Sequence, residues 1–207
     1  KNKLLCLVFA LATVAHAASS DSGTPLLLPE LKPAQQQAQA ARLSAVLLNR
    51  YHYKAKPLDD ALSEKIFDGY LKSLDSDKLF FVQADIDQLA GLRTRLDDAI
   101  LNEDLGIPFA IFNLYAQRYI ERFTYARGLL AEGFDFRQKE SYQFEREKAA
   151  WAKSEAEMRE LWRKRVKNDW LRLKLAGKDN KSIVETLDKR YSQSLKRIGR
   201  IKSEDAF

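Results

Sequence analysis

The chain has 207 residues and a formal net charge of +6, and a composition that is 45% hydrophobic and 31% charged excludes a disordered or fibrous protein. One Cys excludes a disulfide scaffold and a four-cysteine zinc module, and two His leave almost nothing for a histidine-built metal site. Because 8 Gly and 5 Pro are few for this length, a turn-rich β fold is disfavoured and an all-α fold is expected.

Residues 1–17 have the pattern of a secretory signal peptide. Two lysines precede an apolar run over residues 4–15, and Ala15 and Ala17 fit the small-x-small rule of signal peptidase. We therefore expect cleavage between Ala17 and Ala18. The alternative is an apolar helix that is kept in the fold. This run of twelve residues is too short to span a bilayer.

Export would leave the mature chain without a cysteine, because Cys6 lies in the signal peptide. A protein that works outside the cytoplasm without disulfides suits a bacterial periplasm, so a periplasmic location is expected. Residues 137–207 carry 20 basic and 12 acidic side chains, a balance that can attract acidic partners or anionic lipid head groups. Since acids are interleaved throughout, solvated helix faces are the favoured interpretation. We expect that this protein is not an integral membrane protein and that it makes at most a peripheral contact with the inner membrane.

The first part of the mature chain predicts a leader and two helices. Residues 18–33 hold three Pro with little pattern, which predicts a flexible leader before one helical domain over residues 34–207. The first helix is expected over about 34–53, and the second runs from a cap at Asp59 or Asp60 to residue 74. Their apolar stripes are Leu43, Val46, Leu47 and Tyr51 in the first helix, and Leu62, Ile66, Phe67, Tyr70 and Leu74 in the second.

The middle of the chain predicts a turn over 75–78, a short apolar run over 79–82 and a third helix over about 83–101. Ile86, Leu89, Leu92 and Leu96 should face inward from that helix. A fourth helix opens at Gly106 and Pro108 and is stopped by Gly133. Its apolar spacing resembles a coiled-coil seam, which predicts a central helix; the seam is Phe112, Ala116, Tyr119, Phe123, Ala126 and Leu130.

The last third predicts an arm and two more helices, so about six amphipathic helices in one irregular domain. Residues 134–153 lose the helical period and predict an extended aromatic arm or a weak hairpin. Ser154 and Glu157 form a capping box for the fifth helix, which Gly177 ends. The sixth helix starts near 180–182 and continues to about residue 201. The buried face of the fifth is expected to be Met158, Trp162, Val166, Trp170 and Leu173.

No metalloprotease, nucleophile-elbow, P-loop or dinucleotide-binding motif occurs, so we assign no catalytic residue, metal ligand or cofactor. Asp75-x-Asp77 begins like a calcium loop, but Leu79 and Phe80 stand where an oxygen ligand and Gly are needed, which favours a capped turn. His52 has no partner at a catalytic spacing, and a surface or half-buried helix residue is favoured.

A basic run over residues 163–167 lies beside Trp162 and Trp170, a combination that also occurs in RNA-binding surfaces. Both Trp fall on the apolar stripe of the fifth helix, so core packing explains them better. With a signal peptide in front, we expect no nucleic-acid partner.

Several stretches, taken in order along the chain, resemble the amino-terminal region of the periplasmic tail-specific, or carboxy-terminal processing, serine proteases. Their common order and spacing carry the resemblance, which covers nearly all of residues 18–207. The stretches are Tyr51-His52-Tyr53, Ala61 to Leu71, Leu74-Asp75, Phe80-Phe81, Asp85-Ile86, Arg122-Phe123-x-Tyr125-Ala126, Lys148 to Trp151, Leu173 to Lys178, Arg190-Tyr191 and Ser203 to Phe207.

The resemblance implies that this helical domain precedes a PDZ domain, which takes the apolar C-terminus of a protein substrate, and a protease domain with a Ser–Lys dyad. The Lys of such a dyad acts as general base for the Ser, and neither ATP nor metal is needed. Both residues would lie beyond Phe207, so this chain would hold no catalytic residue of the serine endopeptidase.

For this region we hypothesise a scaffold that restricts access to the proteolytic chamber and docks the protease domain or an adaptor lipoprotein, because the sequence predicts a large aromatic-rich core and no site. Some apolar surface that faces the further domains should then be exposed. The alternative, from another class, is a free-standing periplasmic helical chaperone or binding module, whose gene should end near Phe207.

Overall fold

The computed structural model describes residues 28–206, so the predicted signal peptide, its cleavage site at Ala15, Ala17 and Ala18, and most of the predicted leader lie outside the described residues. Over the described range the chain forms seven α-helices, two 3₁₀ helices and no β-strand, which confirms the all-α prediction. The elements are α1 (Gln35–Tyr51), α2 (Asp60–Leu74), α3 (Gln83–Leu89), η1 (Ala90–Leu92), α4 (Leu96–Leu101), α5 (Gly106–Glu132), α6 (Glu155–Leu175), α7 (Asn180–Ile198) and η2 (Ser203–Asp205).

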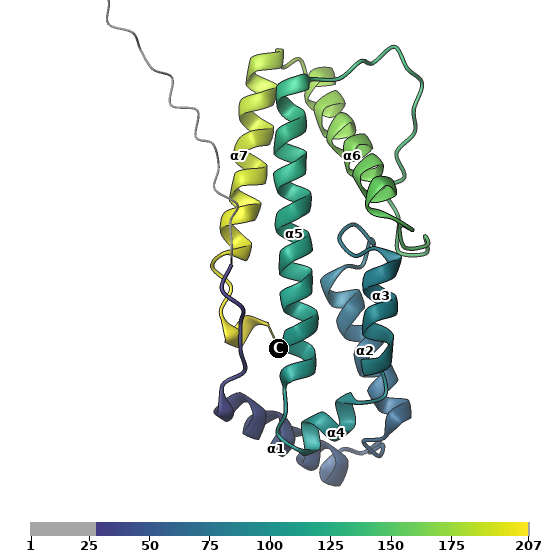
Figure 1. Ribbon diagram of the computed structural model, residues 1–207, viewed down its shortest axis with the longest axis vertical. Helices are drawn as coiled ribbons and strands as arrows, with labels where there is room; N and C mark the ends of the chain where they lie inside the picture. The colour runs from purple at the N-terminus through teal and green to yellow at the C-terminus, as the bar shows by residue number, and fades with distance from the viewer. Residues whose placement is uncertain (1–27, 207) are drawn as a thin grey trace, which may run out of the picture.

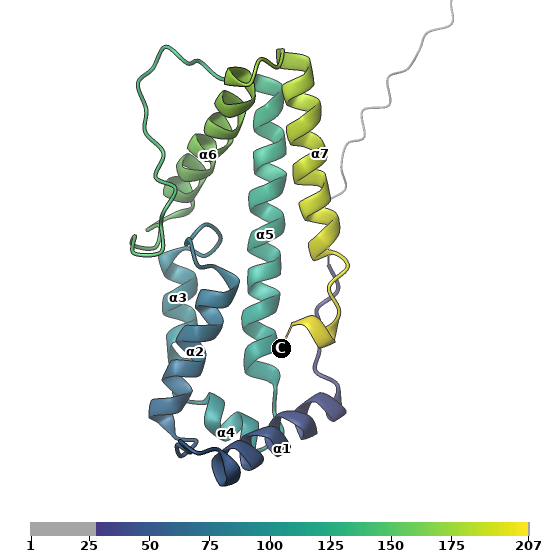
Figure 2. The same cartoon turned by 180° about the vertical axis from the view of Figure 1, so that it is seen from behind.

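The long helix α5 forms the axis of the molecule (Figure 1). Helix α7 runs alongside it, α6 crosses its upper half, and α2 and α3 pack against its lower half (Figures 1 and 2). Helices α1 and α4 close the lower end. The described chain ends beside the lower half of α5, so the last residues return to the end of the molecule where α1 lies (Figure 1).

The predicted seam of α5 is the centre of the core. Five of its six residues are buried and Tyr119 is half-buried, which confirms the prediction of a central helix. The ring of Phe123 lies 5.0 Å from that of Trp162 on α6 and 5.8 Å from that of Tyr191 on α7, measured between centroids. Gly133 ends α5 with a φ of 69°, which Gly adopts without strain from a Cβ.

The predicted third helix, over 83–101, is wrong as one element, because the structure divides it into α3, η1 and α4. The buried hydroxyl of Ser63, on α2, stabilises the interruption between η1 and α4. It donates to the carbonyl of Arg93 at 2.8 Å and accepts the N–H of Leu96 at 2.9 Å. Since the first N–H groups of a helix have no partner inside it, Ser63 caps α4 from another helix. The four apolar residues expected to face inward still join one cluster.

Residues 79–82 cross the middle of the molecule outside any helix, and the carboxylate of Asp75 satisfies their first three N–H groups. These groups, from Leu79, Phe80 and Phe81, donate to it at 2.7–3.0 Å. The predicted turn at 75–78 is therefore a cap for the segment that follows. Buried backbone groups need such partners, because an unpaired one costs about as much as a lost hydrogen bond.

The carbonyl groups of the same segment bind side chains from two other helices. Trp162 on α6 donates its indole N–H to the carbonyl of Leu79 at 2.6 Å. Arg122 on α5 donates to the carbonyl of Phe80 at 3.2 and 3.3 Å, and its guanidinium also binds Glu155 at the start of α6. The segment thereby fixes α2, α5 and α6 relative to one another.

The predicted aromatic arm at 134–153 is extended, and no hairpin forms within it in the described structure. Aromatic rings anchor both ends. Phe134 lies 5.7 Å from Trp170, and Trp151 lies 6.2 Å from Phe81, between ring centroids. In between, the Glu140 carboxylate binds Arg163 and Lys167 of α6.

We predict that Asp75→Ala lowers the free energy of unfolding by about 2–4 kcal/mol, because three N–H groups lose their acceptor and two of them are buried. Urea unfolding followed by tryptophan fluorescence measures the change. Asp77→Ala, in the same turn, is the control and should change stability by less than about 0.5 kcal/mol. Equal effects of the two substitutions would contradict the capping role of Asp75.

We predict that Glu140 contributes to the loss of stability in acid. Hydrogen bonds from Arg163, which has the larger effect, and from Lys167 lower the pKa of Glu140 to about 2. A carboxyl whose pKa is lowered by folding stabilises the fold above its unfolded pKa and loses this contribution as pH falls toward the folded value. The melting temperature of Glu140→Gln should therefore fall less steeply between about pH 4.5 and 2. Glu145→Gln, on the same arm, should follow the wild type.

Candidate docking surface

The side chains that could carry chemistry serve structural roles in the described residues. Residues 28–206 hold no group of three or more His, Cys, Asp or Glu side chains placed to share a metal ion. Asp75, which begins the calcium-like pattern, binds three backbone N–H groups instead. His52 is exposed, as predicted, and its Nδ1 accepts the N–H of Lys54 at 3.2 Å.

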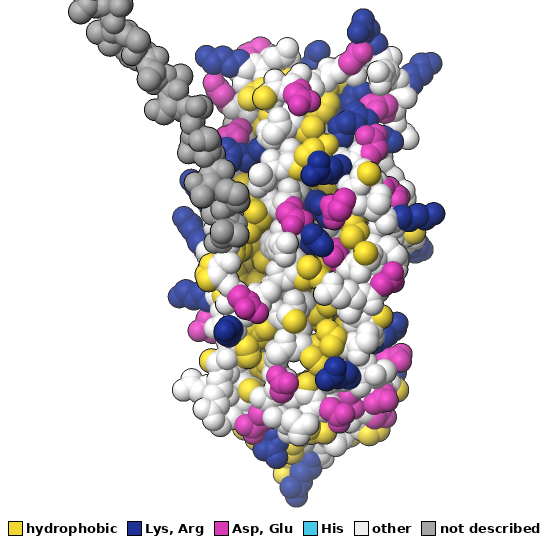
Figure 3. Space-filling model, in the orientation of Figure 1, with side chains coloured by type: hydrophobic (Ala, Val, Ile, Leu, Met, Phe, Trp, Pro, Cys, Tyr) yellow, Lys and Arg dark blue, Asp and Glu magenta, His cyan; other side chains and the backbone are white. Residues whose placement is uncertain are grey.

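The basic run at 163–167 belongs to the packed face and flanks of α6. Trp162 and Trp170 are 0% and 5% exposed, so neither ring can stack on a base and the core interpretation is confirmed. Arg163 pairs with Glu140 and Glu160. On the face seen in Figure 3, charges of both signs are interleaved, with no broad patch of one sign.

The perturbed titratable groups hold helices together. Arg118 on α5 binds both carboxylate oxygens of Asp85, and these hydrogen bonds raise the pKa of the guanidinium. The hydrogen bond from Arg122 lowers the pKa of Glu155. Burial raises the pKa of Tyr191, whose hydroxyl lies 2.9 Å from a carboxylate oxygen of Asp169 on α6. Each shift follows from a contact between elements, so a catalytic role is not needed to explain it.

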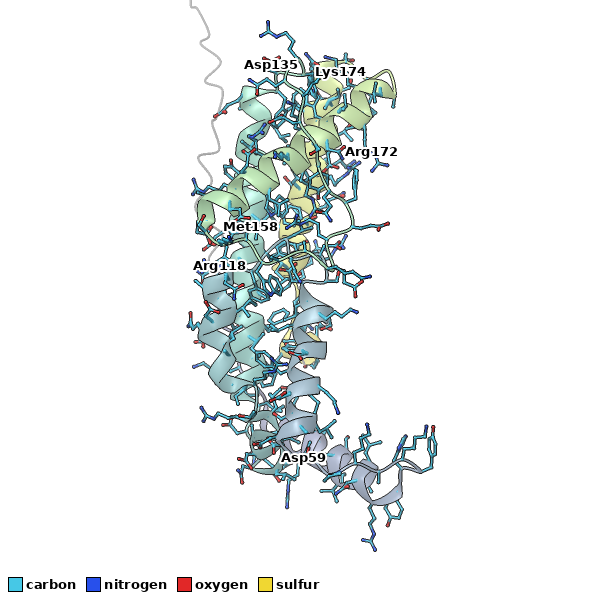
Figure 4. The ribbon with its side chains drawn as sticks, turned by 90° about the vertical axis from the view of Figure 1, so that its right-hand side faces the viewer. Asp59, Arg118, Asp135, Met158, Arg172 and Lys174 are labelled. Atoms are coloured by element: carbon cyan, nitrogen blue, oxygen red, sulfur yellow. The ribbon has the colours of Figure 1, made fainter. Side chains whose placement is uncertain are left out.

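The predicted apolar stripe of the first helix faces solvent. We call it the α1 stripe; its residues Leu43, Val46, Leu47 and Tyr51 are 60%, 45%, 46% and 68% exposed. An apolar stripe normally faces a core, but Ala38 is the only buried residue of α1. Figure 4 shows that α1 extends sideways beyond the bundle, so the bundle covers only part of it. Exposed apolar surface was expected, and it is concentrated on this helix.

A groove with a volume of about 700 Å³ lies on the other side of α1, between it and helices α2 and α4. Ile66 of α2, predicted to be buried, is 36% exposed because it lines this groove. His52, Lys54 and Lys56 lie at one end of it. The apolar walls are Ala41, Ala45, Leu48, Leu62, Ile66 and Ile100.

Cations surround the end of α1. Arg50 and Lys54 lie over the rings of Tyr51 and Tyr53, at 5.4 and 5.5 Å from the centroids. Within residues 28–206 neither has an ion-pair partner, whereas Arg42 earlier in the helix pairs with Glu103 at 3.1 Å. The surface is thus an apolar stripe and groove with a basic rim.

One feature of the sequence indicated this surface, namely apolar residues on two opposite sides of α1. The apolar spacing alone does not show what covers them. Besides the α1 stripe, α1 carries apolar residues on the groove side, including Ala45 and Leu48. A helix that is apolar on opposite sides is normally covered on both. We assigned one packing face to this helix, and the structure shows that neither face is filled by the described chain.

None of the helices within residues 28–206 is long and apolar enough to cross a bilayer.

Comparison with known proteins places the chain in a family. The model of the tail specific protease N-terminal domain matches residues 44–207. A Tail-specific protease of Haemophilus influenzae is 37% identical over 186 residues, which cover 86% of this chain and 27% of that protein. The chain therefore spans about a quarter of the length of this curated relative. Because the family match runs from within α1 to the end of the chain, the chain belongs to the tail-specific protease N-terminal domain family.

Proposed function

We propose that this chain is the non-catalytic helical N-terminal domain of an exported tail-specific serine endopeptidase, which degrades or processes periplasmic proteins from their C-termini. The observation that carries the proposal is the family match over residues 44–207. The engagement of the perturbed acidic and basic groups in contacts between elements is consistent with a domain that performs no chemistry itself.

The rest of the enzyme follows from the resemblance. A PDZ domain would take the apolar C-terminus of the substrate, and a protease domain beyond Phe207 would supply the Ser–Lys dyad. Residues 1–17 would direct export to the periplasm and be removed between Ala17 and Ala18. The helical domain would act as a scaffold that restricts access to the proteolytic chamber and docks an adaptor lipoprotein.

We predict that the full-length protein cleaves a reporter that ends in apolar residues at least about tenfold faster than the same reporter ending in two Asp. Substitution of the dyad Ser should abolish cleavage. The 18–207 chain, purified alone and given the same reporter, should be inactive. Hydrolysis by that shorter chain would overturn the non-catalytic assignment, and equal rates on the two reporters would overturn tail specificity.

A free-standing helical chaperone or binding module is the second candidate, and the exposed α1 stripe is the observation that favours it. Genomic sequence past the codon for Phe207 separates the two. A reading frame that continues into PDZ and Ser–Lys domains supports the protease, whereas a stop codon supports the chaperone or binding module.

A further inference from the structure

We propose that the groove between α1 and helices α2 and α4 binds a long-chain fatty acid, with the acyl chain along the apolar walls and the carboxylate at His52, Lys54 and Lys56. The inference goes beyond the proposed function, because it concerns a small ligand and no step of proteolysis. Three observations carry it: the shape of the groove, the sign of the charges at its end, and the hydrogen-bond donors that these residues offer.

The groove exists because α1 presents small side chains toward α2 and α4. Ala41 and Ala45 are half-buried and line the groove together with Leu62 of α2 and Ile100 of α4. Its volume of about 700 Å³ lies within the range of about 300–1,000 Å³ that is typical of small-molecule sites, which are mostly apolar. The lining follows α1 over residues 40–52, about 18 Å at 1.5 Å per residue, which suits an extended acyl chain.

The charged residues that line the groove are all basic. They are His52, Lys54 and Lys56, and no Asp or Glu lines it in the described structure. Neither lysine forms an ion pair within the described part of the chain. Asp59, the acid that follows Lys56 in the sequence, instead accepts the N–H of Leu62 as the cap of α2. A ligand with an anionic group at one end would therefore complement the charge of the groove.

The three basic residues offer the donors that a carboxylate needs. The Nδ1 of His52 accepts the N–H of Lys54 at 3.2 Å, so in the neutral ring the proton lies on Nε2. This Nε2 can donate to a carboxylate oxygen, and each lysine brings an ammonium group on a flexible stem. Hydrogen bonds between charged partners are about twice as strong as neutral ones. A neutral lipid would leave these cations without a partner, and a short anion would leave the apolar walls uncovered.

Isothermal titration calorimetry of the full-length protein with dodecanoate, kept below its micelle concentration, tests the proposal. We expect saturable binding at one site. Dodecanol has the same chain without the charge, and hexanoate has the same charge with a shorter chain. Each should bind at least about tenfold more weakly than dodecanoate. A lack of saturable dodecanoate binding, or an equal affinity for dodecanol, overturns the proposal.

A substitution that fills the groove locates the site. Ala45→Leu should weaken dodecanoate binding at least about tenfold, because the larger side chain occupies the space of the acyl chain. Its melting temperature should not fall, which shows that the fold is retained. Gln39→Leu, on the same helix but outside the groove, is the control and should bind dodecanoate as the wild type does. Unchanged binding by Ala45→Leu places the fatty acid in another part of the protein and overturns the proposal.

Removal of the charges tests the carboxylate end separately. Lys54→Gln together with Lys56→Gln should weaken dodecanoate binding at least about tenfold and leave dodecanol binding unchanged. A purely structural role of the lysines would affect both ligands alike. Lys32→Gln together with Lys65→Gln is the matched control, because both lysines are exposed and lie outside the groove. Equal weakening by the two pairs indicates a general effect of positive charge and overturns the proposal.

A membrane surface is the other source of acyl chains with anionic groups. Sedimentation of the protein with vesicles that contain anionic phospholipid, without saturable binding of dodecanoate, would assign the groove to a membrane contact and overturn the proposal. None of these measurements requires proteolysis. Loss of reporter cleavage with dodecanoate still bound contradicts the proposed function alone, and retained cleavage without dodecanoate binding contradicts this inference alone.

Discussion

The fold depends on residues 79–82, which lie between α2 and α3, because most of their buried backbone groups must be satisfied by side chains. Leu79 and Val82 pack in the cluster of α6 and α7, whereas Phe81 packs in the cluster of α2 and α4. The carbonyl of Val82 accepts N–H groups from the first turn of α3, whereas the N–H groups of residues 79–81 and the carbonyls of Leu79 and Phe80 bond to side chains. These side chains are Asp75, directly after α2, Trp162 on α6 and Arg122 on α5. The upper and lower halves of the molecule are therefore joined by hydrogen bonds whose loss leaves buried polar groups unpaired.

This construction also accounts for the absence of a recognisable active site among the described residues. Catalytic groups need perturbed surroundings and a free face toward a substrate. Here the perturbed groups Arg118 and Tyr191 form their hydrogen bonds with Asp85 and Asp169 on other elements, and so hold helices together. Among the described residues, α1 carries five of the exposed large hydrophobic side chains: Leu43, Val46, Leu47, Leu48 and Tyr51.

Local signals predicted most of the fold. The apolar faces and the C-terminal ends of α5 and α6 are determined by residues within one or two helical turns. Gly133 and Gly177 accordingly end these helices as expected, with φ of 69° and 83°. The break inside 83–101 was missed because Ser63, which stabilises it, lies 33 residues before Leu96. The bonds of the 79–82 segment were missed for the same reason, since Trp162 is 83 residues away. Apolar spacing showed that α1 had a packing face and could not show what fills it.

The two ends of the molecule differ in a way that bears on assembly. At the upper end, α6, α7 and the arm close on one another through Phe134, Trp170 and the Glu140 ion pairs, and the apolar residues there are mostly covered. At the lower end, Ala206 is anchored but the α1 stripe is open. Burying apolar surface contributes roughly 25 cal/mol per Å², so an uncovered stripe of four large side chains leaves a substantial stabilisation unused. That stabilisation is available to whatever docks at this end.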